Sequence, residues 1–222
     1  MRSFRLWIAA AGLLGVAALA ALGLGLYLYL SPEHAVRRAL EFERRLAGLA
    51  RKEATLPNGL RYYIRTNKQP KDRAELRLVV NAGSILEDED QQGLAHFVEH
   101  MAFNGTKNFP GDGVVKFLQS LGMRFGADLN ASTSFDETIY MLTAPTDKPD
   151  VLDKAFLILE DWAHNVSFNT AEVDKERGVI MEEWRLRRGA GARIQDKELP
   201  IILKGSRYAD RIPIGKTEIL QN

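Results

Sequence analysis

The chain has 222 residues, of which 45% are hydrophobic and 27% charged, and its formal net charge is +1 at pH 7. This near-neutral charge gives no basic excess for binding nucleic acid, and the composition after the N-terminal segment is that of an ordinary soluble domain. The absence of cysteine is compatible with an exported protein that uses no disulfides, although it does not require export.

The N-terminal segment is apolar, because Leu6 to Leu30 contains no charged residue and consists mainly of alanine, leucine and glycine. It exceeds both the roughly 7 to 15 residues of a signal-peptide core and the length of about 20 that spans a bilayer. Tyr27 and Tyr29 lie where an interfacial aromatic belt is expected. We predict a signal anchor, a transmembrane helix over residues 1–30. Cleavage after Ala20 and a buried globular helix are the alternatives.

The next segment, residues 31–53, is rich in arginine and glutamate and predicts a juxtamembrane amphipathic helix. Its apolar positions would either dock on the following domain or lie on lipid. These positions are Val36, Leu40, Leu46 and Leu49.

Residues 54–222 mix strand and helix patterns without strict alternation. This mixture predicts an α+β domain whose sheet is largely antiparallel, with helices packed on one side. A turn at Pro57-Asn58-Gly59 precedes the first strand, and 203–222 is expected to be loop and the start of another helix. Strands are expected at Leu60 to Thr66, Leu76 to Asn81, Met123 to Ala131 and Glu137 to Ala144, and helices around His96, at Val114 to Leu121, Pro149 to Asn165 and Thr170 to Arg188.

The motif with the clearest chemistry is His96-Phe-Val-Glu99-His100. On a helix, positions i and i+4 lie on one face, so both imidazoles can reach one metal ion. Glu99 points to nearly the same side, where a carboxylate can act as general base on a metal-bound water. This order is the inverse of His-Glu-x-x-His. The alternative is a pair of ordinary core or surface histidines.

A catalytic zinc with three protein ligands needs a third ligand, and the helix predicted from Thr170, with Asn169 or Thr170 as N-cap, offers one. Glu176, Val179, Ile180 and Glu183 follow the spacing of one buried helical face. Glu182 is about 100° away around the helix and is expected to be exposed. Two carboxylates on this face suggest a ligand, Glu183, and a partner that orients a histidine. The alternative is that both bond to arginines such as Arg177 or Arg185.

Together, His96-x-x-Glu99-His100 and Glu176-Arg-Gly-Val-Ile-Met-Glu182-Glu183 resemble the pitrilysin/insulinase family of zinc metallopeptidases, in its bacterial periplasmic branch. The resemblance covers the chain from about Ala54 to its end. It implies one zinc ion held by His96, His100 and Glu183, with Glu99 as the catalytic base. It also implies that Glu176 contacts a ligand rather than the metal.

The segment Phe125 to Thr133 resembles the edge strand of this family, along which a peptide substrate is laid. An unpaired strand edge offers backbone groups to any extended peptide. The resemblance places Asn130 and Ala131 at the substrate. The alternative is that Asn130, close to Gly126, marks a turn or a bulge.

The expected function is therefore that of a zinc endopeptidase acting on peptides or unfolded protein segments. The alternative is a noncatalytic scaffold or assembly subunit of a pitrilysin-like complex. Family members pair two homologous α/β halves, so we expect 54–222 to be a truncated N-terminal metallopeptidase domain. Its second half would be supplied beyond Asn222 or by a separate subunit. Alone, such a chain can bind zinc without cleaving peptides, because positioning contributes a large share of the rate.

The membrane orientation rests on two opposed observations. Arg2 and Arg5 favour a cytoplasmic N-terminus, whereas the arginines within 37–45 favour the opposite on a strict positive-inside count. Long translocated domains escape that rule, and the family branch is exported. We therefore predict a single-pass protein of the bacterial inner membrane whose catalytic domain faces the periplasm.

Overall fold

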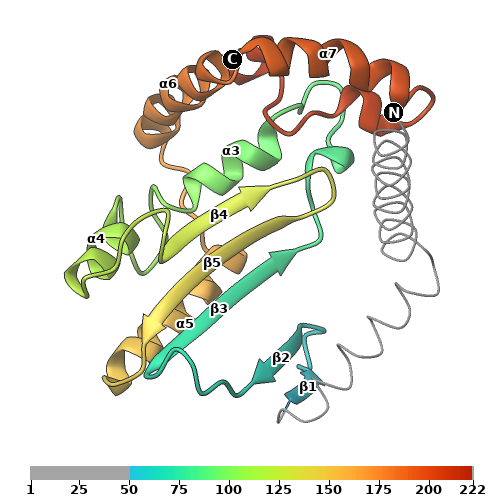
Figure 1. Cartoon of the computed structure of the whole chain (residues 1–222). Coiled ribbons are helices and arrows are strands. Elements are labelled where there is room, and N and C mark those ends of the chain that lie inside the picture. The colour runs from blue at the N-terminus through green and yellow to red at the C-terminus, as the bar shows by residue number, and fades with distance from the viewer. Residues whose placement is uncertain (1–50, 222) are drawn as a thin grey trace, which may run out of the picture. The chain divides into compact units, whose positions relative to one another are not determined.

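The computed structural model describes residues 51–221 (Figure 1). The predicted transmembrane helix over 1–30 and residues 31–50 of the predicted amphipathic helix lie outside this part. Among the described residues, no helix combines the length and the apolar character needed to cross a membrane. The chain divides into two compact units, Met1–Lys71 and Asp72–Asn222.

In the first unit, the described residues form a β-hairpin. Strand β1 (Arg51–Thr55) pairs antiparallel with β2 (Arg61–Arg65). The predicted turn is confirmed, because Gly59 has a φ of +89° and its N–H donates to Leu56 O over 2.9 Å. The predicted helix was wrong at residues 51–53, which belong to β1. They are a strand because they pair with β2, in the register Arg51↔Arg65 to Glu53↔Tyr63, and the local pattern of charges does not reveal this partner.

The second unit contains a three-stranded antiparallel sheet in the order β3-β5-β4. Its strands are β3 (Arg73–Val80), β4 (Leu129–Thr133) and β5 (Thr138–Pro145). Strand β4 begins later than the predicted Met123, because the chain turns before it. Gly126 has a φ of +86°, and its N–H donates to Leu129 O over 2.7 Å. The turn predicted as the alternative therefore exists, but Asn130 lies in the strand beyond it.

Helices cover one face of this sheet, as predicted. In β3, Leu76 and Leu78 pack into the core, whereas the alternating Glu75, Arg77 and Val79 are exposed. Helices α4 (Gly113–Ser120) and α5 (Pro149–His164) supply most of the opposing layer, with α5 on β3 and β5. The most deeply buried residues of this main core are Ala102, Val114, Leu118, Leu129, Leu142, Ala144, Ala155 and Ile158.

Two further helices lie beside this layer and carry the two motifs. Helix α3 (Leu94–Met101) packs against β4, and α6 (Thr170–Leu186) packs against α3 (Figure 1). Asn169 is the N-cap of α6, since its side chain accepts from Ala171 N over 3.0 Å. A small second core joins the two helices to α8 (Thr217–Leu220). Its buried residues are Phe97, Met101, Ile180 and Leu220.

The region after α6 is more regular than predicted. Helix α7 (Ala190–Ile202) was not predicted; it contains Gly191 and Pro200, which weaken a helical pattern in the sequence, and none of its residues is buried. The expected loop after it contains the 3-10 helix η2 (Arg207–Asp210) before α8. Another 3-10 helix, η1 (Ser84–Leu86), precedes α3.

A buried carboxylate fixes the loop that follows α3 to helix α5. Asp161 is fully buried and accepts from Thr106 Oγ1 over 2.6 Å, and from the Asn108 main-chain N–H over 2.9 Å. Its other oxygen accepts from the side-chain amides of Asn108 and Asn165. Burial alone would raise the pKa of Asp161, but these hydrogen bonds outweigh it and hold the pKa below its ordinary value of 3.8.

We predict that Asp161→Asn lowers the free energy of unfolding at pH 7 by about 1–3 kcal/mol, because an amide nitrogen cannot accept these bonds. Urea denaturation measures the difference. A depressed folded-state pKa means that the stabilisation is present above about pH 3.8 and is lost as the pH falls through the folded-state value. The gap between the two proteins should therefore close in strong acid. Equal stability at pH 7 would contradict this role for Asp161.

Candidate metal centre

The two histidines of the motif lie on successive turns of α3, as the i, i+4 spacing predicts. The ring centroids of His96 and His100 are 4.6 Å apart with an interplanar angle of 78°. His96 is buried and His100 is partly buried. Residues Phe97 and Met101 on the same helix enter the small second core. This packing fixes which side of α3 faces α6.

Helix α6 brings Glu183 to both rings. Glu183 Oε2 lies 3.3 Å from His100 Nε2 and 3.6 Å from His96 Nε2. Within the described residues, His96, His100 and Glu183 form a cluster whose ligand atoms lie within 4.8 Å of one another. Ligand atoms at the corners of a tetrahedron around zinc, about 2.0–2.1 Å from it, are separated by about 3.3 Å. The distances to Glu183 therefore fit this metal.

The adjacent carboxylate does not reach the cluster. Glu182 is exposed and makes two hydrogen bonds to the Arg185 guanidinium, at 2.9 and 2.6 Å. The alternative that Glu176 and Glu183 both bond to arginines is wrong for Glu176, which contacts His100 and Asn104, and holds in part for Glu183. Glu183 also contacts an arginine, since its Oε1 is 2.5 Å from Arg187 Nη2. Its other oxygen, Oε2, is the one that faces the imidazoles.

Glu176 lies behind His100, on the side away from Glu183. Its Oε1 is 2.7 Å from His100 Nδ1, and its Oε2 accepts from Asn104 Nδ2 over 2.7 Å. A carboxylate at Nδ1 favours the tautomer with the proton on that nitrogen, which leaves the Nε2 lone pair directed at Glu183. Asn104, which sequence reasoning did not identify, completes the hydrogen bonding of Glu176.

The two imidazoles have opposite electrostatic surroundings. Burial and then the neighbouring His100 lower the pKa of His96 to about 4. Burial acts in the same direction on His100, but the hydrogen bond that its Nδ1 donates to Glu176 and the nearby carboxylates outweigh it and raise the pKa of His100. Among the described residues, His96 Nδ1 is the buried side-chain atom without a hydrogen-bond partner. Its polar interactions therefore pass through Nε2, the atom that faces Glu183.

Glu99 lies beside the cluster and is held by the sheet. Thr133, the last residue of β4, donates from Oγ1 to Glu99 Oε2 over 2.7 Å. Burial raises the pKa of Glu99, and the Thr133 bond opposes this shift. A buried carboxylate with a raised pKa suits a group that takes up and returns a proton. Sequence reasoning assigned Thr133 no role, although it ends the segment identified as the edge strand.

Among the described residues, β4 is an edge strand of the three-stranded sheet, as predicted. Bonds from Thr143 N to Asp128 O and from Ser134 N to Glu137 O, both 2.8 Å, fix the phase of its ladder. By the alternation of antiparallel pairs, the N–H and C=O groups of Ala131 and Thr133 point away from β5. Asn130 is exposed, with its side chain on the sheet face opposite to that of Thr133.

The fold thus brings five predicted site residues together, namely His96, Glu99, His100, Glu176 and Glu183. The arrangement offers two nitrogen ligands and one oxygen ligand, the donor set of a catalytic zinc site with a fourth position open. Asn130 and Ala131 lie on the adjacent edge strand.

Comparisons with known proteins agree with this geometry. Residues 62–187 match the family described as insulinase (Peptidase family M16). A probable zinc protease PqqL of Haemophilus influenzae is 46% identical over 166 residues, which are 75% of this chain and 18% of the relative. A zinc protease PQQL-like protein of Arabidopsis thaliana is 46% identical over 167 residues, with the same two coverages.

A solved structure supports the fold. The first half of the periplasmic protease PqqL from Escherichia coli superimposes with a TM-score of 0.74 at 42% identity, covering 78% of this chain and 37% of that chain. The chain spans less than a fifth of the length of the two curated relatives named above. On the match over residues 62–187, the chain belongs to the insulinase family, Peptidase family M16.

Proposed function

We propose that this chain carries the zinc site of a metalloendopeptidase that hydrolyses peptides or unfolded protein segments. The observation that carries the proposal is the convergence of Glu183 Oε2 on both histidine Nε2 atoms, at 3.3 and 3.6 Å, with Glu99 alongside. The names of the relatives, as zinc proteases, support the choice of metal. A noncatalytic scaffold would not need this ligand set.

In this proposal, His96, His100 and Glu183 hold the zinc ion, and Glu176 orients His100. Zinc, when bound, would polarise the scissile carbonyl and lower the pKa of the attacking water. Glu99 takes the proton of that water and returns it to the leaving amine. Its bond from Thr133 directs one carboxylate oxygen to the sheet, which leaves the other to move the proton.

The substrate would lie along the free edge of β4. Ala131 and Thr133 direct backbone groups outward there, and an extended peptide can pair with such groups whatever its sequence. Asn130 would contact the substrate near the scissile bond with its exposed side chain, from the face of β4 opposite to Thr133. Because Thr133 contacts Glu99 at the end of this strand, a peptide paired with β4 would be delivered beside the base.

For the whole protein, we propose a domain over 54–222 that is the zinc-binding part of a longer, two-half peptidase. The match to the first half of a solved PqqL supports this division. We also propose a membrane anchor over 1–30 and an amphipathic helix over 31–50, with the catalytic domain in the periplasm. Two observations support this proposal: Leu6 to Leu30 contains no charged residue, and the similar Escherichia coli protein is a periplasmic protease.

We predict that Glu99→Gln in the full-length protein abolishes peptide hydrolysis while zinc content is retained, because the change removes the base and no ligand. Elemental analysis and cleavage of an unfolded protein substrate measure the two properties. A variant that cleaves at the wild-type rate would show that Glu99 is not the base.

The glutamates of α6 should differ in their effect on zinc. Glu183→Gln should weaken zinc binding by more than about 100-fold, since it removes a metal bond, whereas Glu176→Gln should reduce affinity or activity on the order of 10- to 100-fold, the usual cost of losing a partner that orients a ligand. The neighbouring Glu182→Gln is the matched control and should be nearly silent. Competition with a chromophoric chelator gives the affinities, and loss of zinc in Glu182→Gln alone would overturn the ligand assignment.

Thr133→Val should lower kcat on the order of 10- to 100-fold, because it removes a hydrogen bond to a charged carboxylate that is typically worth about 1.5–3 kcal/mol. Zinc affinity should stay unchanged, since Thr133 touches no proposed ligand. Thr133→Ser retains a hydroxyl and should restore most of the rate. Steady-state kinetics of the wild type and the two variants measure kcat. An unchanged kcat in Thr133→Val would show that Thr133 does not support Glu99.

A further inference from the structure

Helix α3 begins in an unusual way, because its cap comes from outside the helix. The N-cap residue Gly93 has a φ of +102° and offers no side chain. The first N–H groups are instead bound by Glu87, whose Oε2 accepts from Gly93 N over 3.0 Å and whose Oε1 accepts from Ala95 N over 2.8 Å. Glu87 is only 5% exposed. One carboxylate therefore accepts hydrogen bonds from two N–H groups at the start of the helix.

The helix depends on these two hydrogen bonds because it is short. Helix α3 has eight residues, and isolated helices of this length are marginal in water. A carboxylate at the N-terminus also interacts favourably with the helix dipole. His96 is the residue directly after Ala95, so the first turn that Glu87 binds is the turn that carries a proposed zinc ligand.

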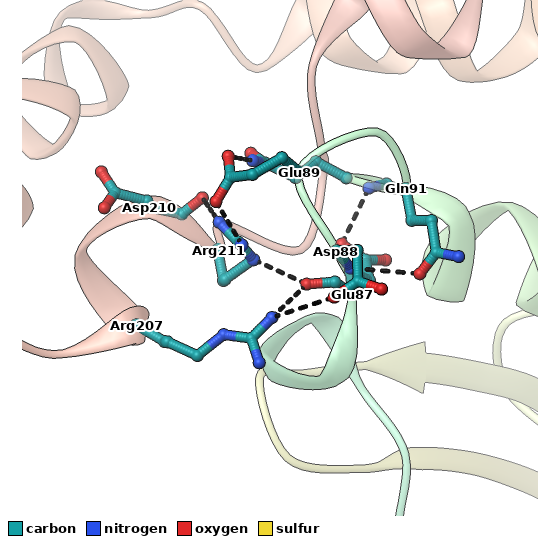
Figure 2. Close-up of polar contacts among 9 residues, drawn as sticks. Glu87, Asp88, Glu89, Gln91, Arg207, Asp210 and Arg211 are labelled. Atoms are coloured by element: carbon teal, nitrogen blue, oxygen red, sulfur yellow. Dashed lines mark hydrogen bonds and ion pairs between the residues drawn. The ribbon is translucent and has the colours of Figure 1, made fainter.

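Glu87 is itself held from the opposite side by the C-terminal segment (Figure 2). Arg211, 4% exposed, donates from Nε to Glu87 O over 2.9 Å and from Nη2 to Glu89 Oε1 over 2.6 Å. Arg207 Nη2 also donates to Glu87 O. The main chain of Arg211 is fixed in turn, because its carbonyl accepts from Ser84 Oγ over 2.5 Å. Glu87 is thus bound through its carboxylate to α3 and through its carbonyl to two arginines.

A backbone contact closes the same junction. A Cβ placed on Gly215 would lie 2.3 Å from Gly93 Cα, which is closer than any real Cβ contact, so the two glycine backbones touch. Lys216 N also donates to Gln92 O over 3.3 Å. The start of α3 is therefore confined between Glu87 on one side and Gly215 on the other.

We propose that Glu87 is a positioning residue for the zinc site, which sets the location of the first turn of α3 and thereby of His96. Arg211 acts through Glu87 by fixing its main chain. The inference rests on the proposed zinc peptidase function. The far end of α3 has independent supports, since Met101 is fully buried and Trp162 Nε1 donates to Ala102 O over 3.0 Å. Loss of the cap should therefore loosen the His96 end while the His100 end stays in place.

The test is Glu87→Gln in the full-length protein. The amide keeps the size of the side chain but loses the charge and one of the two acceptors. Zinc affinity, measured by chelator competition well below the unfolding temperature, should fall on the order of 10-fold, as for the loss of other outer hydrogen-bonding partners. Turnover should fall through kcat more than through KM, because no substrate contact is removed.

Asp161→Asn is the matched control, because Asp161 is also a buried carboxylate that accepts several hydrogen bonds, yet those bonds come from no residue of α3. It should lower stability and leave zinc affinity unchanged. If the two variants are equally destabilised and also lose zinc affinity equally, Glu87 is structural only and the inference fails. The same conclusion follows if Glu87→Gln binds zinc as tightly as wild type.

Arg211→Lys provides a milder variant if Glu87→Gln does not fold. A lysine cannot reproduce the two contacts of the guanidinium, so zinc affinity should fall by less than in Glu87→Gln but in the same direction. An Arg211→Lys protein that binds zinc as tightly as wild type would overturn the role of Arg211. Failure of the wild-type protein to bind zinc at all would instead refute the proposed function, so the two ideas fail separately.

Discussion

The hydrogen bond between His100 and Glu176, 2.7 Å long, is the interaction on which the geometry of the site depends. It joins α3 to α6 beside the buried apolar side chains of Phe97, Met101 and Ile180. Placing a carboxylate and an imidazole in such surroundings is costly unless each satisfies the other. Because Glu176 and Glu183 lie two turns apart on the same face of α6, this bond also fixes the height at which Glu183 meets the rings.

The described domain has two hydrophobic cores of different size, and the helices that carry the site pack in the smaller one. The larger core, between the sheet and helices α4 and α5, contains most of the buried apolar residues. The smaller core has four buried residues and lies where α3, α6 and α8 meet. The elements of the site therefore rest on few apolar contacts, and polar contacts supply what packing does not. Arg177 illustrates this, since its Nη1 donates to Leu220 O over 2.7 Å and so ties α6 to α8.

Helical periodicity predicted the part of the site that lies on single helices. The spacing of His96 and His100, and the choice of Glu183 over Glu182, follow from 3.6 residues per turn and agree with the structure. Contacts between different helices and strands could not be predicted from spacing in the sequence. Thr133, Asn104 and the cap by Glu87 depend on which segments pack together, and no spacing in the chain encodes that.

The same distinction explains one of the errors in the fold. The helical pattern over 51–53 was overridden by pairing with β2, and α7 was missed because Gly191 and Pro200 interrupt its helical pattern. The start of β4 was placed too early because the predicted strand ran through Gly126, although a glycine inside a strand pattern often marks a turn such as the left-handed one found there.

The two imidazoles of the site are supported unequally, and this asymmetry shows where positioning matters most. His100 is oriented by Glu176 through Nδ1, so its ring direction is set by a hydrogen bond. In the described part of the chain, His96 Nδ1 has no such partner. The direction of the His96 ring must then come from the helix that carries it and from the packing around that helix. A displacement of the first turn of α3 would be transmitted to His96 undiminished, whereas Glu176 would resist it at His100. The hydrogen bonds from the first turn of α3 to Glu87 therefore fix the position of His96, which lacks a hydrogen bond of its own at Nδ1.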